Sequence, residues 1–219
     1  MRAGAQTLKS QIYEKTLSMI LNQEFPMDEL LAESRLTQLF EVSRAPVREA
    51  LIELCRDGIL QNIPRAGYQI IRISEKKMRD AFELRLILEL EGLNLAYPRL
   101  SPENLNELTD IADKSDKVRA EGTVQDSLNI KMCLNNNFHV KLNAFSGNQL
   151  MNQHLKETLQ LLQRGLAQVM IHEYEVPYPD ATFHSGLVKA LKKGDLELAR
   201  ENLKSDILAY ERELWRNYI

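Results

Sequence analysis

Two arginines four residues apart, Arg44 and Arg48, lie in a stretch whose apolar spacing predicts a short helix. Ser43 before them can cap the helix N-terminus through its side-chain oxygen, and Pro46 is tolerated in the first helical turn. Both guanidinium groups would project from the leading half of one helix face, where they could bind phosphates and guanine edges. The stretch favours the recognition helix of a helix-turn-helix, although arginines on a helix face are also common as solvated surface.

A second group of polar side chains, in the C-terminal half, could bind a metal ion or a ligand. Asn135 and His139 are four residues apart and would share a helix face, while His184 and Asp206 belong to two later predicted helices. Imidazole and carboxylate groups from facing helices are a common way to build such a site inside a bundle. No dedicated motif such as HExxH accompanies them, and a buried histidine is more often a hydrogen-bonded core residue. Spacing alone leaves both interpretations open.

The arginine stretch belongs to a series of short elements between residues 1 and 73. Apolar spacing predicts two helices before it, over 7–21 and 34–40, and a plausible left-handed cap at Gly58 after it. Two β-like runs follow, over 59–63 and 68–72. Three helices and a hairpin, in that order, are typical of a winged helix-turn-helix.

The predicted hairpin has a basic tip, Pro64-Arg65-Ala66-Gly67. In a winged helix the tip lies against DNA, so Arg65 and the backbone of Gly67 would contact phosphate or the minor groove.

The remainder of the chain predicts helices and no convincing strand, so the fold class is mainly α. The six expected helices cover residues 78–97, 105–118, 124–145, 150–172, 181–193 and about 196–215. Breaks fall at Pro98, 121–123, 146–148 and 176–180. Helices of this length joined by short loops predict an antiparallel bundle. We therefore expect two domains, 1–73 and 76–219.

Composition adds little to this interpretation. The net charge is −3, with nine basic and nine acidic residues before residue 74, so total charge does not indicate a nucleic-acid partner. No apolar run suggests a signal peptide or a membrane span, and we expect a cytoplasmic protein. The two cysteines, Cys55 and Cys133, lie far apart, and we expect free buried thiols.

The N-terminal part resembles the GntR family of bacterial transcription regulators. Its motif V-S-R-x-P-V-R-E-A-L appears as Val42 to Leu51, followed by Leu54, Gly58 and a wing glycine, Gly67. The family's DNA-contacting residues correspond here to Arg35, Ser43, Arg44, Arg48 and Gly67. One position departs from the family pattern: Glu41 stands where a glycine is usual in the turn, and we expect the turn to tolerate it.

The helical part resembles the FCD effector-binding domain of the FadR-like branch of this family. The first helix has the R-x-x-x-E landmark as Arg85 and Glu89, and Phe138-His139 and Gly147-Asn148 follow. A late His-rich motif matches His184 with Leu187, Ala190, Leu191, Asp195 and Ala199. The resemblance implies a metal site of Asp and three His at the positions of Asn135, His139, His184 and Asp206.

Two of these four positions differ from the family's ligand set, Asn replacing Asp and Asp replacing His. The formal charge of the set is unchanged, and both amide and carboxylate oxygens can bind divalent ions. Replacing an imidazole by oxygen should shift the preference from Zn²⁺ or Ni²⁺ toward Mn²⁺ or Mg²⁺ and weaken binding. The alternative is a metal-free pocket in which His139 and His184 bind an effector directly. Arg85 would pair with the effector's carboxylate, unless it forms only a structural pair with Glu89.

Together these features predict a cytoplasmic, ligand-responsive transcription regulator, more often a repressor in this family, and not an enzyme. A homodimer would bind a palindromic operator, and the helical domain would sense a small organic acid. Two alternatives remain open: a metal-dependent helical enzyme, and a helical adaptor whose winged domain no longer binds DNA.

Overall fold

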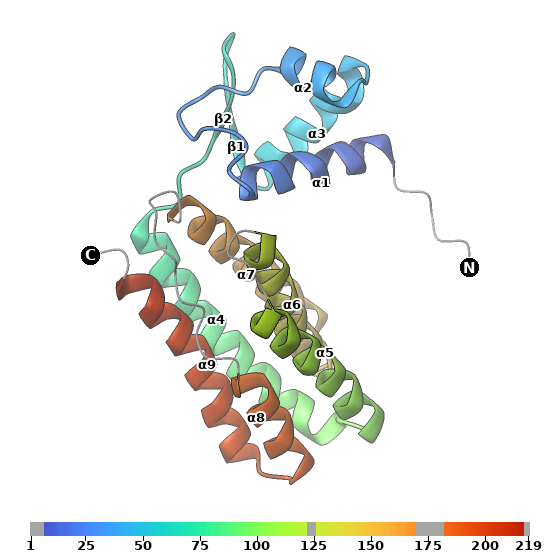
Figure 1. Ribbon diagram of the computed structural model, residues 1–219, viewed down its shortest axis with the longest axis vertical. Coiled ribbons are helices and arrows are strands. Elements are labelled where there is room, and N and C mark those ends of the chain that lie inside the picture. The colour runs from blue at the N-terminus through green and yellow to red at the C-terminus, as the bar shows by residue number, and fades with distance from the viewer. Residues whose placement is uncertain (1–6, 122–125, 170–181, 217–219) are drawn as a thin grey trace. The chain divides into compact units, whose positions relative to one another are not determined.

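The computed structural model describes residues 7–121, 126–169 and 182–216, and it divides the chain into two compact units (Figure 1). One unit is Met1–Ile73 and the other is Ser74–Ile219. Both are mainly helical, which confirms the predicted fold class. Among the described residues, no helix is both long and apolar enough to cross a membrane.

The first unit contains three helices and a two-stranded antiparallel sheet. Its elements are α1 (Leu8–Leu21), α2 (Glu33–Phe40), α3 (Arg44–Arg56), β1 (Leu60–Ile63) and β2 (Gly67–Ile70). The side chain of Thr7 caps α1 by accepting a hydrogen bond from the amide of Ser10. The buried face of α3, formed by Val47, Ala50, Leu51 and Leu54, lies in the core of this unit. The order of elements is that of a winged helix, as predicted.

The turn between α2 and α3 differs from expectation in one respect. Ser43 occupies the N-cap position of α3, but its side chain makes no capping hydrogen bond. The predicted side-chain cap is therefore wrong, and the side chain of Ser43 is exposed to solvent. Glu41 adopts the left-handed conformation, with φ 53° and ψ 42°, that the usual glycine would adopt without strain.

The wing, defined here as β1, β2 and their connecting turn, is tied to the segment before α2. In the hairpin Asn62 pairs with Tyr68 and Ile63 with Gly67. Tyr68 also forms a β-bridge with Leu31: the amide of Leu31 donates to Tyr68 O at 2.7 Å and the amide of Tyr68 donates to Leu31 O at 2.9 Å. Backbone hydrogen bonds therefore attach the wing to the helical part of the unit.

The second unit is a bundle of six α-helices within the described residues, as predicted. They are α4 (Glu75–Ala96), α5 (Pro102–Glu121), α6 (Asp126–Ala144), α7 (Gln149–Val169), α8 (Thr182–Lys192) and α9 (Leu196–Arg216), with a 3₁₀ turn η1 (Tyr97–Arg99) after α4. Figure 1 shows them running roughly alongside one another. The predicted break over 176–180 lies outside the described residues.

Helix α4 packs against α6, α7 and α9 and so forms the centre of the bundle. It begins three residues earlier than expected, because the Ser74 side chain accepts a hydrogen bond from the amide of Lys77 and caps the helix. Both cysteines are free, but Cys133 is exposed on α6 and Cys55 is half-buried, so the prediction that they are buried is wrong. The spacing of apolar residues around Cys133 did not indicate that this residue would lie on the solvent-exposed face of α6.

Candidate functional site

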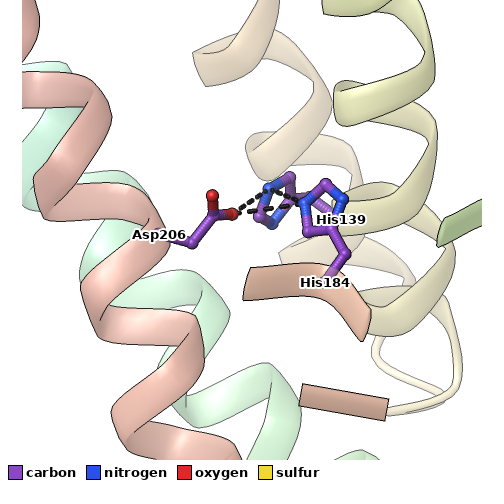
Figure 2. A group of neighbouring side chains, drawn as sticks. All are labelled: His139, His184 and Asp206. Atoms are coloured by element: carbon purple, nitrogen blue, oxygen red, sulfur yellow. Dashed lines mark hydrogen bonds and ion pairs between the residues drawn. The ribbon is translucent and has the colours of Figure 1, made fainter. Parts of the chain in front are cut away.

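Three of the side chains singled out in the C-terminal half meet inside the second unit. His139 comes from α6, His184 from α8 and Asp206 from α9, and Figure 2 shows them pointing toward one another. Asp206 Oδ2 lies 3.0 Å from His139 Nε2 and 3.2 Å from His184 Nε2, and the two Nε2 atoms are 3.3 Å apart. All three side chains are buried. We call this group the His139–His184–Asp206 cluster.

The cluster is supported from α4 by a buried ion pair. Arg85 Nε donates to Glu89 Oε1 at 2.6 Å, and the other carboxylate oxygen of Glu89 lies 2.5 Å from His139 Nδ1. Arg85 and Glu89 are each only 2% exposed. The sequence had suggested Glu89 as a structural partner of Arg85 and had missed its contact with His139. The four-residue spacing of Arg85 and Glu89 indicated that these two side chains could pair. It gave no indication that the second carboxylate oxygen of Glu89 would contact a histidine on α6.

The contact with Glu89 favours the form of His139 that carries a hydrogen on Nδ1, so that Nε2 is the ring nitrogen directed at the cluster. A neutral imidazole that donates through Nδ1 to a carboxylate must present an unprotonated Nε2. This Nε2 faces Asp206 Oδ2, which accepts no hydrogen bond of good geometry. In this neutral form two electron-pair donors face one another in a buried place, and a positive charge between them, either a proton on Nε2 or a metal ion, would relieve the repulsion.

The pKa values reflect the same imbalance of charge. Burial alone would lower the pKa of His139, but the carboxylates of Glu89 and Asp206 outweigh burial and raise it. Burial alone would raise the pKa of Asp206, but the two neighbouring imidazoles hold it well below its usual range. If both imidazoles were neutral, Arg85 would balance only one of the two buried carboxylates, Glu89 and Asp206, and the raised pKa of His139 shows that its imidazole can take up a proton to balance the other. A cation is the natural complement of such a group.

The donor set fits a divalent metal ion. Ligand atoms about 2.0–2.2 Å from an ion, at angles of roughly 90–110°, lie about 3–3.5 Å from one another. The three separations within the cluster lie in this range. Two imidazole nitrogens and one carboxylate oxygen would leave coordination positions open, as catalytic and sensory metal sites require.

The other residues predicted for this site are placed as follows. Asn135 is buried on α6, one helical turn before His139 and on the same face. Arg85 forms a buried ion pair with Glu89, which is one of the two roles predicted for it from the sequence. The structure thus brings together His139, His184 and Asp206 directly and connects Arg85 to them through Glu89.

The residues predicted to contact DNA lie on the surface of the first unit. Ser43 and Arg44 are exposed at the start of α3, and Arg48 is exposed one turn later. Arg48 Nε lies 3.7 Å from Glu33 on α2. Arg35, also on α2, forms a 2.8 Å ion pair with Glu29 and stacks over Phe25. Both of these interactions join Arg35 to residues of the segment before α2.

The wing tip presents Arg65 to solvent in the left-handed conformation, with φ 64°. Gly67, at the start of β2, has φ 136°, which L side chains rarely adopt. A Cβ atom there would lie 2.7 Å from Leu31 O, the acceptor in the β-bridge. Gly67 is therefore required for the wing to attach to the unit, in addition to any contact with DNA.

We expect Gly67→Ala to destabilise the first unit more than Gly58→Ala does. Both glycines have positive φ, but a Cβ atom at Gly58 would meet nothing within 4 Å. The left-handed strain common to both costs about 1 kcal/mol, and the contact with Leu31 O raises the cost at Gly67 to roughly 2–4 kcal/mol. Calorimetry of the full chain measures both. Equal losses would show that the Leu31 bridge adapts to the added methyl group.

Two family descriptions match the two units. Residues 8–70 match "Bacterial regulatory proteins, gntR family", and residues 80–208 match the FCD domain. The chain is 29% identical over 196 residues to the HTH-type transcriptional regulator YdhC of Bacillus subtilis, covering 88% of this chain and 84% of that protein. It is also 29% identical over 208 residues to an HTH-type transcriptional regulator of Streptomyces ambofaciens, covering 95% and 85%.

Solved structures share the fold of the whole chain. The structure of McbR/YncC from Escherichia coli superposes with a TM-score of 0.80 at 20% identity, covering 97% of this chain and 99% of that one. A putative GntR regulator from Rhodococcus gives a TM-score of 0.72 at 20% identity, covering 94% and 97%. At this identity the likeness concerns the fold alone.

Proposed function

The chain belongs to the gntR family of bacterial regulatory proteins and is a transcription regulator with an FCD domain, and we propose that it is a cytoplasmic repressor. It binds a two-fold symmetric operator as a homodimer, and its helical unit senses a small organic acid through the His139–His184–Asp206 cluster. Binding of the acid changes operator affinity, as a coupling free energy between the two sites requires.

Operator recognition is assigned to α3 and the wing. Arg44 and Arg48 read base edges in the major groove, while Ser43, Arg35, Arg65 and the backbone of Gly67 contact phosphates or the minor groove. The observation that carries this proposal is the exposure of both arginines on the leading half of α3. In a winged helix, this is the part of the recognition helix that meets base edges.

The dimer is assigned to the second unit, where α4 has an exposed apolar face. Leu84 is 43% exposed and Ile87 is 66% exposed. Lys77, which is also exposed, lies two helical turns before Leu84. An antiparallel copy of α4 centred on Leu84 would place Lys77 opposite Glu91, so apolar contact and charge are both complementary. A second copy of the chain therefore suits this face.

Effector sensing is assigned to the His139–His184–Asp206 cluster, with Asn135 as a further oxygen donor. A divalent ion held there would offer an open coordination position to a carboxylate. Glu89 orients the ring of His139, and Arg85 holds Glu89 in place through a charge-assisted hydrogen bond. The bundle excludes water from these groups, so their charges interact strongly with a bound anion.

Selection from a pool of random-sequence DNA duplexes tests the proposal. We expect the purified full-length chain to enrich a two-fold symmetric sequence whose affinity falls steeply with salt, as phosphate contacts require. Light scattering measures the mass of the free protein and of the complex. Failure to enrich any sequence would overturn the proposal and favour the adaptor alternative, while turnover of a substrate at the cluster would favour the enzyme alternative.

A further inference from the structure

The carboxylate of Glu33 contacts both α3 and the wing. Its Oε1 atom accepts a 3.3 Å hydrogen bond from the hydroxyl of Tyr68 on β2, and it lies 3.7 Å from Arg48 Nε on α3. Glu33 is itself the first residue of α2. One oxygen atom thus connects the three elements that a winged helix uses to bind DNA.

Glu33 places a carboxylate at the N-terminus of α2. It lies in the first turn of α2, where the unpaired amides and the helix dipole stabilise a negative charge. The N-cap residue, Ala32, provides no side-chain cap that would compete for those amides. The Glu33 side chain is 25% exposed, so water screens it less than a fully exposed carboxylate. The hydroxyl of Tyr68, whose ring is buried, anchors it.

Glu33 contacts Arg48 at Nε, so the two Nη groups of the guanidinium remain available to bind DNA. The Arg48 side chain is 69% exposed, and no partner of its Nη groups is seen among the residues described. At 3.7 Å this contact is an ion pair and not a hydrogen bond, so charge attraction orients the guanidinium and leaves its two Nη donors as a fork. A fork that favours one orientation discriminates between bases better than a freely rotating one.

We propose that Glu33 is a positioning residue for Arg48: it increases discrimination between DNA sequences while it lowers affinity for DNA of any sequence. The inference rests on the proposed function, because it requires that α3 reads DNA. The two effects have separate causes. Fixing the fork favours one base geometry over others, whereas the negative charge repels every phosphate backbone that approaches α3.

Glu33→Gln tests the proposal, because the amide oxygen can still accept from Tyr68 while the charge is lost. We expect about 2- to 5-fold tighter binding to random-sequence duplex at low salt. The ratio of the affinity for the selected operator to that for random duplex should fall by roughly 3- to 10-fold. This is smaller than the full discrimination that one contact between an arginine and a base supplies, because Arg48 is still present in the variant. Fluorescence anisotropy on both duplexes measures the two quantities.

Two comparisons separate positioning from a general effect of charge. Glu41→Gln removes the same charge from the turn before α3, and among the described residues no hydrogen bond or ion pair joins the Glu41 side chain to Arg48 or Tyr68. It should tighten binding to both duplexes equally and leave the ratio unchanged. In a background carrying Arg48→Ala, Glu33→Gln should no longer change the ratio, because the residue it positions is gone.

The outcomes are distinguishable. If the wild-type chain enriches no operator, the proposed function fails and the role of Glu33 fails with it. If the wild type discriminates and Glu33→Gln keeps the same ratio, or Glu41→Gln lowers the ratio equally, the positioning role is overturned. Thermal unfolding of each variant shows whether the first unit remains folded, and Glu33→Asp, which restores the charge, should recover part of the ratio.

Discussion

Replacing both Arg44 and Arg48 by alanine is expected to reduce operator affinity to the level of random DNA. Each arginine lies exposed on the leading half of α3, one turn from the other. A contact between arginine and guanine contributes about 1–3 kcal/mol per half-site. Because a dimer presents each residue twice, each single substitution should cost roughly 2–6 kcal/mol. Anisotropy titrations with the selected operator at several salt concentrations measure the loss.

Arg56→Ala is the matched control for these substitutions. Arg56 is also exposed and lies on the same helix, but in its last turn. Its loss removes the same charge from the end of α3 that faces away from the predicted base contacts, so we expect less than a few-fold change. A comparable loss from Arg56→Ala would show that net charge, and not the position of Arg44 and Arg48, determines binding.

The second large effect is expected at the His139–His184–Asp206 cluster. The wild-type chain, purified without added metal or chelator, should contain about one divalent ion per chain by elemental analysis, and His184→Ala or Asp206→Ala should remove it. At a metal concentration 100 times Kd, binding should stabilise the wild type by about 2.7 kcal/mol. For a chain of this size, that is an increase in Tm of roughly 5–10 °C. Neither variant should show the increase.

His154→Ala provides the control, since His154 is an exposed imidazole on α7 that contacts Glu157 and not the cluster. It should keep both the metal and the increase in Tm. Glu89→Gln should retain the three ligand atoms but weaken metal binding by about 10- to 100-fold, the usual effect of losing a group that orients a ligating histidine. A wild type that takes up neither Mn²⁺, Zn²⁺ nor Ni²⁺ would contradict the metal site and leave a pocket that binds the effector directly.

The sequence predicted the parts of this molecule that depend on local pattern. The recognition helix was expected from the spacing of Val47, Ala50 and Leu51 behind two arginines, and the structure has α3 at Arg44–Arg56. Two β-like runs on either side of a turn with Gly67 predicted the wing. Local sequence was sufficient because helix faces and hairpin turns are determined by neighbours within a few residues.

The contacts that support the sites could not be predicted in the same way. The contact of Glu89 with His139 joins residues fifty positions apart, and that of Glu33 with Tyr68 joins residues thirty-five positions apart. Each depends on how two elements are rotated and shifted against one another, and periodicity gives the face of a helix but not its register with a neighbour.

The bridge between Leu31 and Tyr68 should protect the amides of both residues from hydrogen exchange. Leu31 is fully buried, Tyr68 is 4% exposed, and their amides each donate to the other's carbonyl. Such amides exchange with solvent only when the surrounding structure opens, so both should share the slow exchange of the core of this unit. We therefore expect the wing to open together with that core. Independent motion should be confined to the turn between β1 and β2, where Arg65 lies.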